Sequence, residues 1–512
     1  MSRKVVYFLP RVLKYIALLF VFSFLLLFIQ SAFAKKEYEI GVFLLIALIL
    51  IAVTYLTSVS IPLKFFLPGI LFLTAFVLAP ILYTVAMSTV KYQTGNYISK
   101  TEAIDRINLL AIAPDEAGTT FDVVTGKTGS EIAILASDPV DKSYFLSTPT
   151  DRILLDIGQL TLDENGVATS APNFTPSAAD GSTSFDQDFS KYRFKYEGDY
   201  FIMMEGSTVG AVVRQTYFFN EKTGKFENLL DGQVYEDNGK GNFANTNDSE
   251  DILQPGWRAP IWFSHYIDIV KNEKVRGPLV SVFLWTITFA GLTVLTQFAL
   301  GLLVAMAMNK AIRGRRIYRS IFILPYAMPS IMSILIWAGM FNTEFGAINT
   351  LFNTDIAWFQ NANFAKFAVI LVNLWLGFPY FYLITSGAMQ AIPSELSEAA
   401  QIDGASPRQV FTKITLPLLL KIVSPLLIAS FAFNFNNFNL IYLLTGGGPR
   451  NDLDGEVAGA TDILISYTYR IAFGTNVQDL GFASAISVII FFIVATISLY
   501  GIRKSKVLDT FS

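Results

Sequence analysis

The sequence contains no cysteine and a single histidine, His265, so several kinds of site are excluded at the start. Disulfide bonds, thiolate zinc sites and cysteine nucleophiles all need cysteine, and one histidine cannot form a two-histidine zinc motif. Charge is also scarce, because Asp, Glu, Lys and Arg make up only 15% of the 512 residues. In soluble proteins these four residue types make up roughly a quarter of the chain. Since 53% of the residues are hydrophobic and gather in long runs, the sequence predicts a polytopic membrane protein.

Eight stretches are apolar and long enough to cross about 30 Å of hydrocarbon as helices. They are residues 12–34, 40–57, 65–90, 280–308, 321–341, 367–389, 422–444 and 480–502. Basic residues precede the first stretch, as in a signal peptide. Its apolar part is about twice the length of a signal core, however, so it is predicted to stay as an anchor.

The distribution of positive charge predicts the orientation of these spans. The loop 309–319 after the fourth span carries five positive charges and no acid, and Arg503, Lys504 and Lys506 follow the eighth span. The N-terminus is basic too. Both termini are therefore predicted to be cytoplasmic, as an even number of spans requires, and the long segment between the third and fourth spans is predicted to lie outside.

That long segment is acidic and predicts a separate domain. Residues 92–270 contain 27 acidic and 13 basic residues, a net charge of −14, whereas the rest of the chain has a net charge of +11. Strands are predicted at residues 153–157, 192–196, 200–204 and 209–219, between clusters of Gly, Asp, Asn and Ser. A compact β-rich domain is expected. After it, Trp257, Trp262 and Tyr266 predict a short interfacial helix.

The most specific motif lies in the loop 390–417, between the sixth and seventh spans. It consists of Glu398, Ala399, Ala400 and Gly404, followed by Ile414, Thr415, Leu416 and Pro417. Pro393 and Ser394 favour a helix start, and the small residues permit close docking on another surface. Gly404 permits a sharp turn before a second short helix that is expected to end near Pro417. On helix chemistry alone, an ordinary amphipathic loop helix explains the motif equally well.

The full spacing resembles the signature of the binding-protein-dependent transport system inner-membrane components, the permease subunits of bacterial ABC importers. Other runs that look like sugar-permease motifs are Phe345-Gly346, Asn349, Thr445-Gly446-Gly447-Gly448-Pro449, Tyr467, Tyr469 and Phe473. Three extra N-terminal spans, a large insert after the third and the run from Ser430 to Phe438 are similar to the maltose/maltodextrin permease subunits. The resemblance is strong from about Trp257 onward, and in the insert it rests mainly on length and position.

This resemblance implies the architecture and the partners. The expected fold is an all-α polytopic membrane protein with eight transmembrane helices, of the type I ABC importer class, with a β-rich extracytoplasmic domain inserted between helices 3 and 4. Residues 1–91 would form a three-helix membrane region, 92–256 the periplasmic insert, and 257–512 the permease core with five spans and the coupling loop. The implied role is a non-catalytic subunit of the bacterial inner membrane that binds no cofactor.

The implied partners are a second permease subunit, an ATPase dimer that hydrolyses ATP, a periplasmic maltose-binding protein, maltose or maltodextrin, and the lipid bilayer. Nucleic acid is not among them. The ATPase would dock on the coupling residues Glu398, Ala399, Ala400, Gly404, Ile414, Leu416 and Pro417.

A cluster of four asparagines near the middle of the seventh span also has a direct physical interpretation. They are Asn434, Asn436, Asn437 and Asn439. At this depth an amide without a partner costs several kcal/mol. One continuous helix face is predicted to hold Ser430, Phe433, Asn434, Asn437 and Ile441. Amides suit sugar hydroxyls and Phe433 offers a flat surface for a pyranose ring, so a ligand face is favoured over hydrogen bonding between helices, the alternative for buried asparagine. Asn436 and Asn439 are expected to point elsewhere.

The fifth and sixth spans have interrupted centres. Pro325 and Pro329 break the fifth, and Gly377 and Pro379 weaken the sixth. Irregular backbone at this depth is tolerated where it faces protein or a wet cavity. The resemblance implies a sugar site at Tyr326, Ser330, Leu376, Gly377, Tyr380, Ser430, Phe433, Asn434 and Asn437. None of these residues is charged, which suits a neutral ligand.

Other signals and functions are less favoured. Gly126-Lys127-Thr128 resembles the end of a phosphate-binding loop, but Phe stands at position 121 where glycine is required. Ser264-His265 lies in the aromatic stretch before the fourth span, so catalysis there is not expected. A membrane insertase would need a charged hydrophilic groove, and a sensor would need a cytoplasmic output domain. A carrier for a neutral hydroxyl-rich ligand is therefore the preferred prediction.

Overall fold

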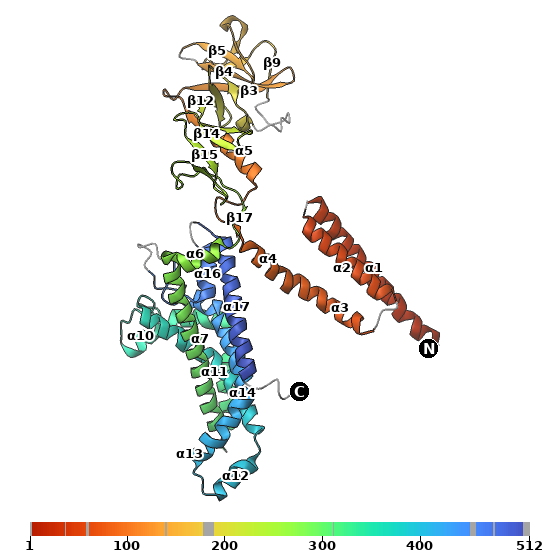
Figure 1. Cartoon of the computed structure of the whole chain (residues 1–512), viewed down its shortest axis with the longest axis vertical. Helices are drawn as coiled ribbons and strands as arrows, with labels where there is room; N and C mark the ends of the chain where they lie inside the picture. Colours follow the sequence, from red (N-terminus) through yellow and green to blue (C-terminus); the bar gives the residue numbers. More distant parts are fainter. Residues whose placement is uncertain are drawn as a thin grey trace. The chain divides into compact units, whose positions relative to one another are not determined.

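The computed structural model describes residues 3–35, 37–57, 61–138, 141–177, 189–310, 312–450, 457–474 and 477–504. Lys506, which contributed to the predicted orientation, lies outside these residues. The chain divides into two compact units, Met1–Ala86 and Met87–Ser512 (Figure 1).

The first unit consists of apolar helices. Its elements are α1 (Arg3–Ala34), α2 (Tyr38–Leu56), α3 (Ile61–Leu73), the π-helical turn η1 (Thr74–Leu78) and α4 (Ala79–Met87). α1 packs against α2, and α3, η1 and α4 continue as one helix over Ile61–Met87. Most of their large apolar side chains are exposed. Helices that are apolar all round without protein cover suit a lipid environment.

The insert is rich in β-structure, as predicted. A nine-stranded antiparallel sheet runs β10-β11-β12-β3-β4-β5-β6, with β2 paired to β12 and β9 paired to β3. Its strands are β2 (Ile112–Pro114), β3 (Thr120–Thr128), β4 (Glu131–Asp138), β5 (Ser143–Ser147), β6 (Arg152–Leu154), β9 (Phe174–Pro176), β10 (Phe194–Lys195), β11 (Tyr200–Glu205) and β12 (Val209–Gln215). Phe145, Phe194 and Ile202 are fully buried in its core.

A second sheet and short elements complete the insert. The four-stranded sheet has the order β13-β14-β15-β16. The remaining elements are α5 (Lys100–Leu110), β7 (Thr161–Leu162), β8 (Ala168–Ser170), β13 (Tyr217–Asn220), β14 (Lys225–Asn228), β15 (Val234–Asp237) and β16 (Phe243–Asn245), with 3-10 turns η2 (Ile157–Gln159) and η3 (Phe189–Lys191).

The predicted strands of the insert hold in part. β11 covers the strand expected at 200–204, and the strand expected at 209–219 divides into β12 and β13. The strands expected at 153–157 and 192–196 are shorter in the structure, as β6 and β10. A 3-10 turn follows β6, and irregular backbone flanks β10.

The insert joins the core through two adjacent strands. β1 (Val90–Lys91) pairs antiparallel with β17 (Ala259–Pro260), and the Gly256 N–H donates to the Gly95 carbonyl over 2.7 Å. The expected interfacial helix needs correction here. Trp257 packs against Phe243 inside the insert, with ring centroids 5.0 Å apart, and Trp262 precedes the helix at a φ of 54°. The helix itself, α6 (Ser264–Lys271), keeps only Tyr266 of the three aromatics.

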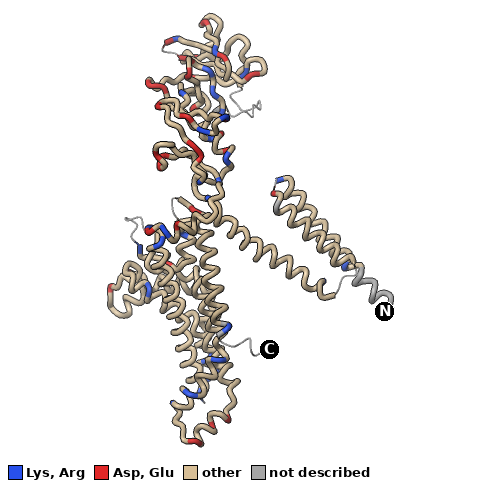
Figure 2. Tube along the Cα trace, viewed as in Figure 1, with Lys and Arg blue, Asp and Glu red and all other residues tan. Residues whose placement is uncertain are grey.

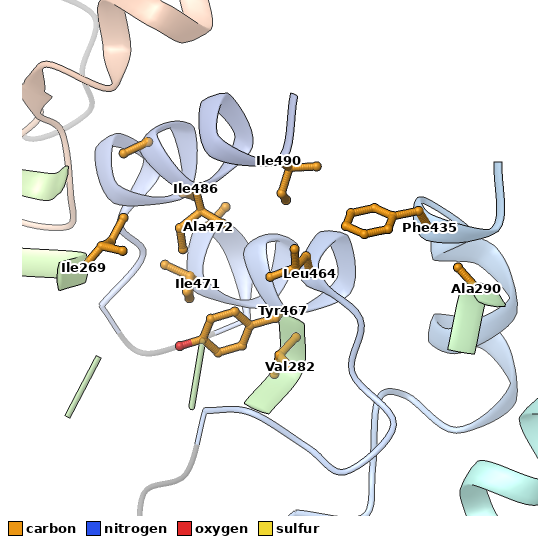
Figure 3. Close-up of a cluster of buried hydrophobic side chains, with 12 residues drawn as sticks. Ile269, Val282, Ala290, Phe435, Leu464, Tyr467, Ile471, Ala472, Ile486 and Ile490 are labelled. Carbon is orange, nitrogen blue, oxygen red and sulfur yellow. The ribbon is translucent and has the colours of Figure 1, made fainter. Parts of the chain in front are cut away.

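The core is helical. Its elements are α7 (Glu273–Met308), α8 (Arg315–Ala327), α9 (Ser330–Met340), α10 (Ala347–Phe352), α11 (Ala362–Gln390), α12 (Ser394–Ile402), α13 (Pro407–Val410), the π-helical turn η4 (Phe411–Thr415), α14 (Leu416–Phe435), α15 (Phe438–Leu444), α16 (Leu464–Phe473) and α17 (Leu480–Lys504). α7 packs along α11, and α14 packs against both. A buried cluster from α6, α7, α14, α16 and α17 includes Phe435, Leu464 and Tyr467 (Figure 3).

The predicted count of eight spans is not confirmed. Among the described residues six helices are long and apolar enough to cross a membrane, or seven if α8 and α9 count as one span. These two helices meet at a 92° bend, because Pro329 fixes its own φ and holds Met328 in an extended conformation. The expected second span is the shorter apolar helix Ile40–Leu56. Charged residues are sparse along the long core helices and dense in the insert (Figure 2).

Candidate functional site

A cavity of about 600 Å³ lies among α7, α8, α9, α11, α14 and α15. This volume is in the range of small-molecule sites. All nine residues of the predicted sugar site line it: Tyr326, Ser330, Leu376, Gly377, Tyr380, Ser430, Phe433, Asn434 and Asn437. The other residues of its lining are Gln297, Pro325, Met328, Ile334, Asn373, Ala429, Asn439 and Leu440. None of the described residues in this lining carries a charge, so the cavity suits a neutral polar ligand.

The bend between α8 and α9 brings two of these residues to the cavity. Tyr326 lies in the last turn of α8 and Ser330 is the first residue of α9, on either side of Pro329. Both side chains are exposed. The proline therefore turns the chain so that a phenol and a hydroxyl face the same space.

A second break, between α14 and α15, corrects the predicted continuous face. α14 ends at Phe435, and Asn437 is the N-cap of α15, where its Oδ1 accepts from the Leu440 N–H over 3.4 Å. Asn437 thus reaches the cavity through a helix break. Ile441 is fully buried in a neighbouring hydrophobic cluster and is not part of the lining. The polar run itself explains the break, because asparagine side chains compete for backbone hydrogen bonds.

The two asparagines expected to point elsewhere behave differently. Asn439 lines the cavity, so that expectation is wrong for it. Asn436 lines a separate hollow with Thr468 and Ser487.

Asn434 is held by a hydrogen bond between helices, the alternative that the sequence left open, and by one within α14. Its Oδ1 accepts from the Asn373 Nδ2 of α11 over 2.8 Å, and its Nδ2 donates to the Ser430 carbonyl over 2.9 Å. The Asn373 Nδ2 also donates to the Thr293 Oγ1 of α7 over 3.3 Å. Asn434 is only 2% exposed, whereas the neighbouring Phe433 is 70% exposed. Phe433 therefore offers a free ring, and Asn434 fixes the wall behind it.

Sequence reasoning missed Gln297 and Asn373. Gln297 of α7 is buried and its Nε2 donates to the Asn373 carbonyl over 2.6 Å. Each is an amide inside an apolar span, which is the signal that could have identified it. Their pairing could not be read from the sequence, because it depends on how α7 and α11 are rotated against each other.

The residues of the predicted coupling loop lie on exposed structure. α12 begins after Pro393, and no residue of α12 is buried. Glu398, Ala399 and Pro417 are exposed, and Ala400, Ile414 and Leu416 are half-buried. Gly404 has a φ of 85°, the left-handed region that favours glycine. α12 and α13 lie at the opposite end of the core helices from α6 and α16 (Figure 1).

One expectation about this loop is wrong. The second helix does not end near Pro417, because α13, η4 and α14 form one helix over Pro407–Phe435. Pro417, which has no N–H to donate, lies inside this helix directly after the π-helical turn Phe411–Thr415. A single helix therefore runs from this loop to the cavity.

The other motifs behind the resemblance have structural contacts. The Asn349 Nδ2 donates to the Thr343 and Ile356 carbonyls, each over 3.0 Å, and ties the loop after α9 together. In the Gly446–Gly447 turn both glycines have positive φ, and the Gly446 carbonyl accepts from Arg470 over 2.7 Å. Arg470 also pairs with the buried Asp462 over 3.0 Å. The described residues include no cluster of three or more His, Asp or Glu that could hold a metal ion.

Comparison with known proteins identifies one family and several similar proteins. Residues 297–506 match the family described as binding-protein-dependent transport system inner membrane components. The maltose/maltodextrin transport system permease protein MalF of Vibrio cholerae serotype O1 is 36% identical over 460 residues, which cover 86% of this chain and 85% of that protein. MalF of Yersinia pestis is 32% identical over 520 residues, covering 99% and 96%. A solved bacterial ABC transporter for alginate import has a TM-score of 0.42 and 21% identity, covering 48% of this chain and 84% of that one.

Proposed function

The chain belongs to the family of maltose/maltodextrin transport system permease proteins MalF, and from this premise we propose that it forms half of the path by which an ABC importer carries maltose and maltodextrins across the bacterial inner membrane. ATP hydrolysis belongs to separate subunits, and this chain is the non-catalytic translocation subunit. It binds no cofactor of its own.

The observation that carries the proposal is the uncharged cavity on which the nine predicted sugar-site residues converge. Its walls combine an exposed aromatic ring with neutral hydrogen-bonding groups. The Phe433 ring is free for stacking against a pyranose face. Hydroxyls of Tyr326, Ser330 and Tyr380 and amides of Asn437 and Asn439 can donate and accept, as sugar hydroxyls do.

The exposed α12 is the surface we assign to the ATPase subunit. Small side chains at Ala399 and Ala400 allow close approach, and the turn at Gly404 sets the angle between α12 and the long helix that follows. Closure of the ATPase pair would push on α12. Since Pro407–Phe435 is one helix, that push would reach the residues around Phe433 and Asn434 and move the cavity between inward and outward access.

The remaining partners follow from the same family membership. A second permease subunit completes the path, and a periplasmic maltose-binding protein delivers sugar. In this proposal both termini are cytoplasmic and the acidic insert lies in the periplasm. The insert is the surface that receives the binding protein.

The proposal is tested by purifying the chain from its native membrane in mild detergent. We expect an ATPase pair and a homologous permease to co-purify. A Glu398→Lys variant should no longer co-purify with the ATPase subunits but should still co-purify with the second permease, because only the docking contact changes. Recovery of the wild-type chain without either partner would contradict the assignment.

A further inference from the structure

Gln297 is a buried amide that faces the cavity from α7. Its side chain is 3% exposed and belongs to the lining. The Nε2 donates across to α11, to the Asn373 carbonyl over 2.6 Å. It thus lines the same cavity as the groups that the family resemblance assigned to the sugar.

The chemistry of this contact fixes which way the amide points. A backbone carbonyl can only accept, so the nitrogen of Gln297 must face Asn373 and the oxygen must face away. Among the described residues no donor binds the Gln297 Oε1, and this oxygen is not one of the fully enclosed unpaired atoms, so it is accessible from the cavity. An amide oxygen that is accessible from the cavity and has no protein donor is free to accept a hydrogen bond from a ligand. A hydroxyl of a ligand in the cavity is the kind of donor that this oxygen can accept from.

Gly377 makes room for this amide. A Cβ built on Gly377 would overlap the carboxamide of Gln297 and would lie only 2.7 Å from its Oε1. The amide therefore lies flat against the bare backbone of α11. The role of Gly377 in the site is therefore to leave space for the Gln297 side chain. This role does not depend on any contact of the Gly377 backbone with the sugar.

We propose that Gln297 is a specificity-determining residue, whose Oε1 accepts a hydrogen bond from one hydroxyl of the sugar in the cavity. This inference rests on the proposed function and adds a selection rule to it. A ligand with a hydroxyl at that point satisfies the oxygen. A ligand with hydrogen there covers the oxygen without pairing it, and a site built to hydrogen-bond a hydroxyl discriminates against such an analogue.

The test compares maltose with a series of monodeoxymaltoses on the purified complex, held outward-facing with a non-hydrolysable ATP analogue. Retained labelled sugar is measured, and the share held by the binding protein alone is subtracted. In the wild type, loss of the hydroxyl that meets Gln297 should weaken binding roughly three- to tenfold. In Gln297→Met, which is similar in length and forms no such bond, maltose should bind that much more weakly and this one penalty should disappear.

The penalties of the other deoxy analogues should stay as in the wild type. If every analogue keeps its wild-type penalty in Gln297→Met, Gln297 has only a structural role and the inference is wrong. Gln297→Leu provides the same comparison if the methionine variant does not assemble.

Gly377 provides an independent arm. Gly377→Ala should remove the same hydroxyl penalty, because its Cβ displaces the amide. In a Gln297→Ala background, which leaves the space empty, adding Gly377→Ala should change maltose binding less than twofold, since the two residues act as one unit. If Gly377→Ala weakens maltose binding as much in the Gln297→Ala background as in the wild type, the inference is contradicted. If wild-type complex retains no maltose at all, the proposed function fails and not this assignment.

Discussion

The hydrogen bond between Asn373 and Asn434 predicts that Asn434→Leu weakens the packing of α11 on α14 as well as the site. Both amides are almost fully buried, and the Asn434 Oδ1 accepts from the Asn373 Nδ2 over 2.8 Å. With leucine at 434, the Asn373 nitrogen keeps only its longer 3.3 Å bond to Thr293. Leaving a buried donor underused costs about 1–3 kcal/mol in general.

The magnitude in a membrane is expected to be at the low end of that range. Hydrogen bonds between membrane helices stabilise the fold by about 0.6 kcal/mol on average and about 1.7 kcal/mol at most in double-mutant cycles. The values are small because the polar groups find other hydrogen-bond partners when the helices separate in the bilayer. We therefore expect Asn434→Leu to lower the free energy of unfolding by roughly 1–2 kcal/mol. Asn434→Leu and Asn373→Leu together should cost less than the sum of the two.

The assay is a double-mutant cycle on the purified subunit, unfolded by increasing SDS in mixed micelles. The coupling energy between Asn373→Leu and Asn434→Leu should be about 0.6–1.7 kcal/mol. Asn373→Leu with Asn437→Leu is the matched control, because in the described part of the chain the Asn437 side chain bonds only to the Leu440 N–H, and that pair should be additive. Additive losses for Asn373 and Asn434 would refute the interpretation that their bond holds the two helices together.

Three further predictions concern coupling, docking and acid stability. Glu398→Lys should leave the protein inserted but abolish sugar-stimulated ATPase activity in proteoliposomes, and normal stimulation would contradict the docking surface. Because Gly95 and Gly256 are hydrogen-bonded, a short glycine linker can replace the insert between them; association of the binding protein, measured in detergent, should then weaken while the core still assembles. Hydrogen bonds, chiefly from Asn245, hold the pKa of Asp251 below its usual value, so their stabilisation is complete above about pH 5 and is lost as pH falls further. Circular dichroism of the full chain in urea should show the stability gap between wild type and Asp251→Asn narrowing from pH 6 to pH 3.

Much of the architecture could be predicted because it follows from composition. Long apolar runs produced the long core helices, and the Gly- and Asp-punctuated acidic segment produced the β-rich insert. The interruptions were harder to predict, because Pro329 and the asparagine run after Phe435 break spans that hydropathy alone treats as continuous. Local hydrogen bonding and fixed φ decide those points.

The site, like the fold, was predicted only in part. The resemblance supplied nine residues, and all of them line one cavity. The direct physical argument supplied only the face around Phe433 and Asn434. Contacts such as Gln297 with Asn373 depend on the rotation of two helices about their axes, which a periodic pattern in one sequence does not specify.

The central claim is tested most directly by ATP-dependent uptake of labelled maltose into proteoliposomes that contain this chain with its second permease, its ATPase pair and the binding protein. The wild type should accumulate maltose. Phe433→Ala should lose most of this uptake, because a ring that lines the cavity and is 70% exposed is gone. Asn436→Leu, whose residue faces a separate hollow, should transport normally per assembled complex. Uptake by Phe433→Ala equal to that of the wild type, or no uptake by the complete wild-type complex, would contradict the account.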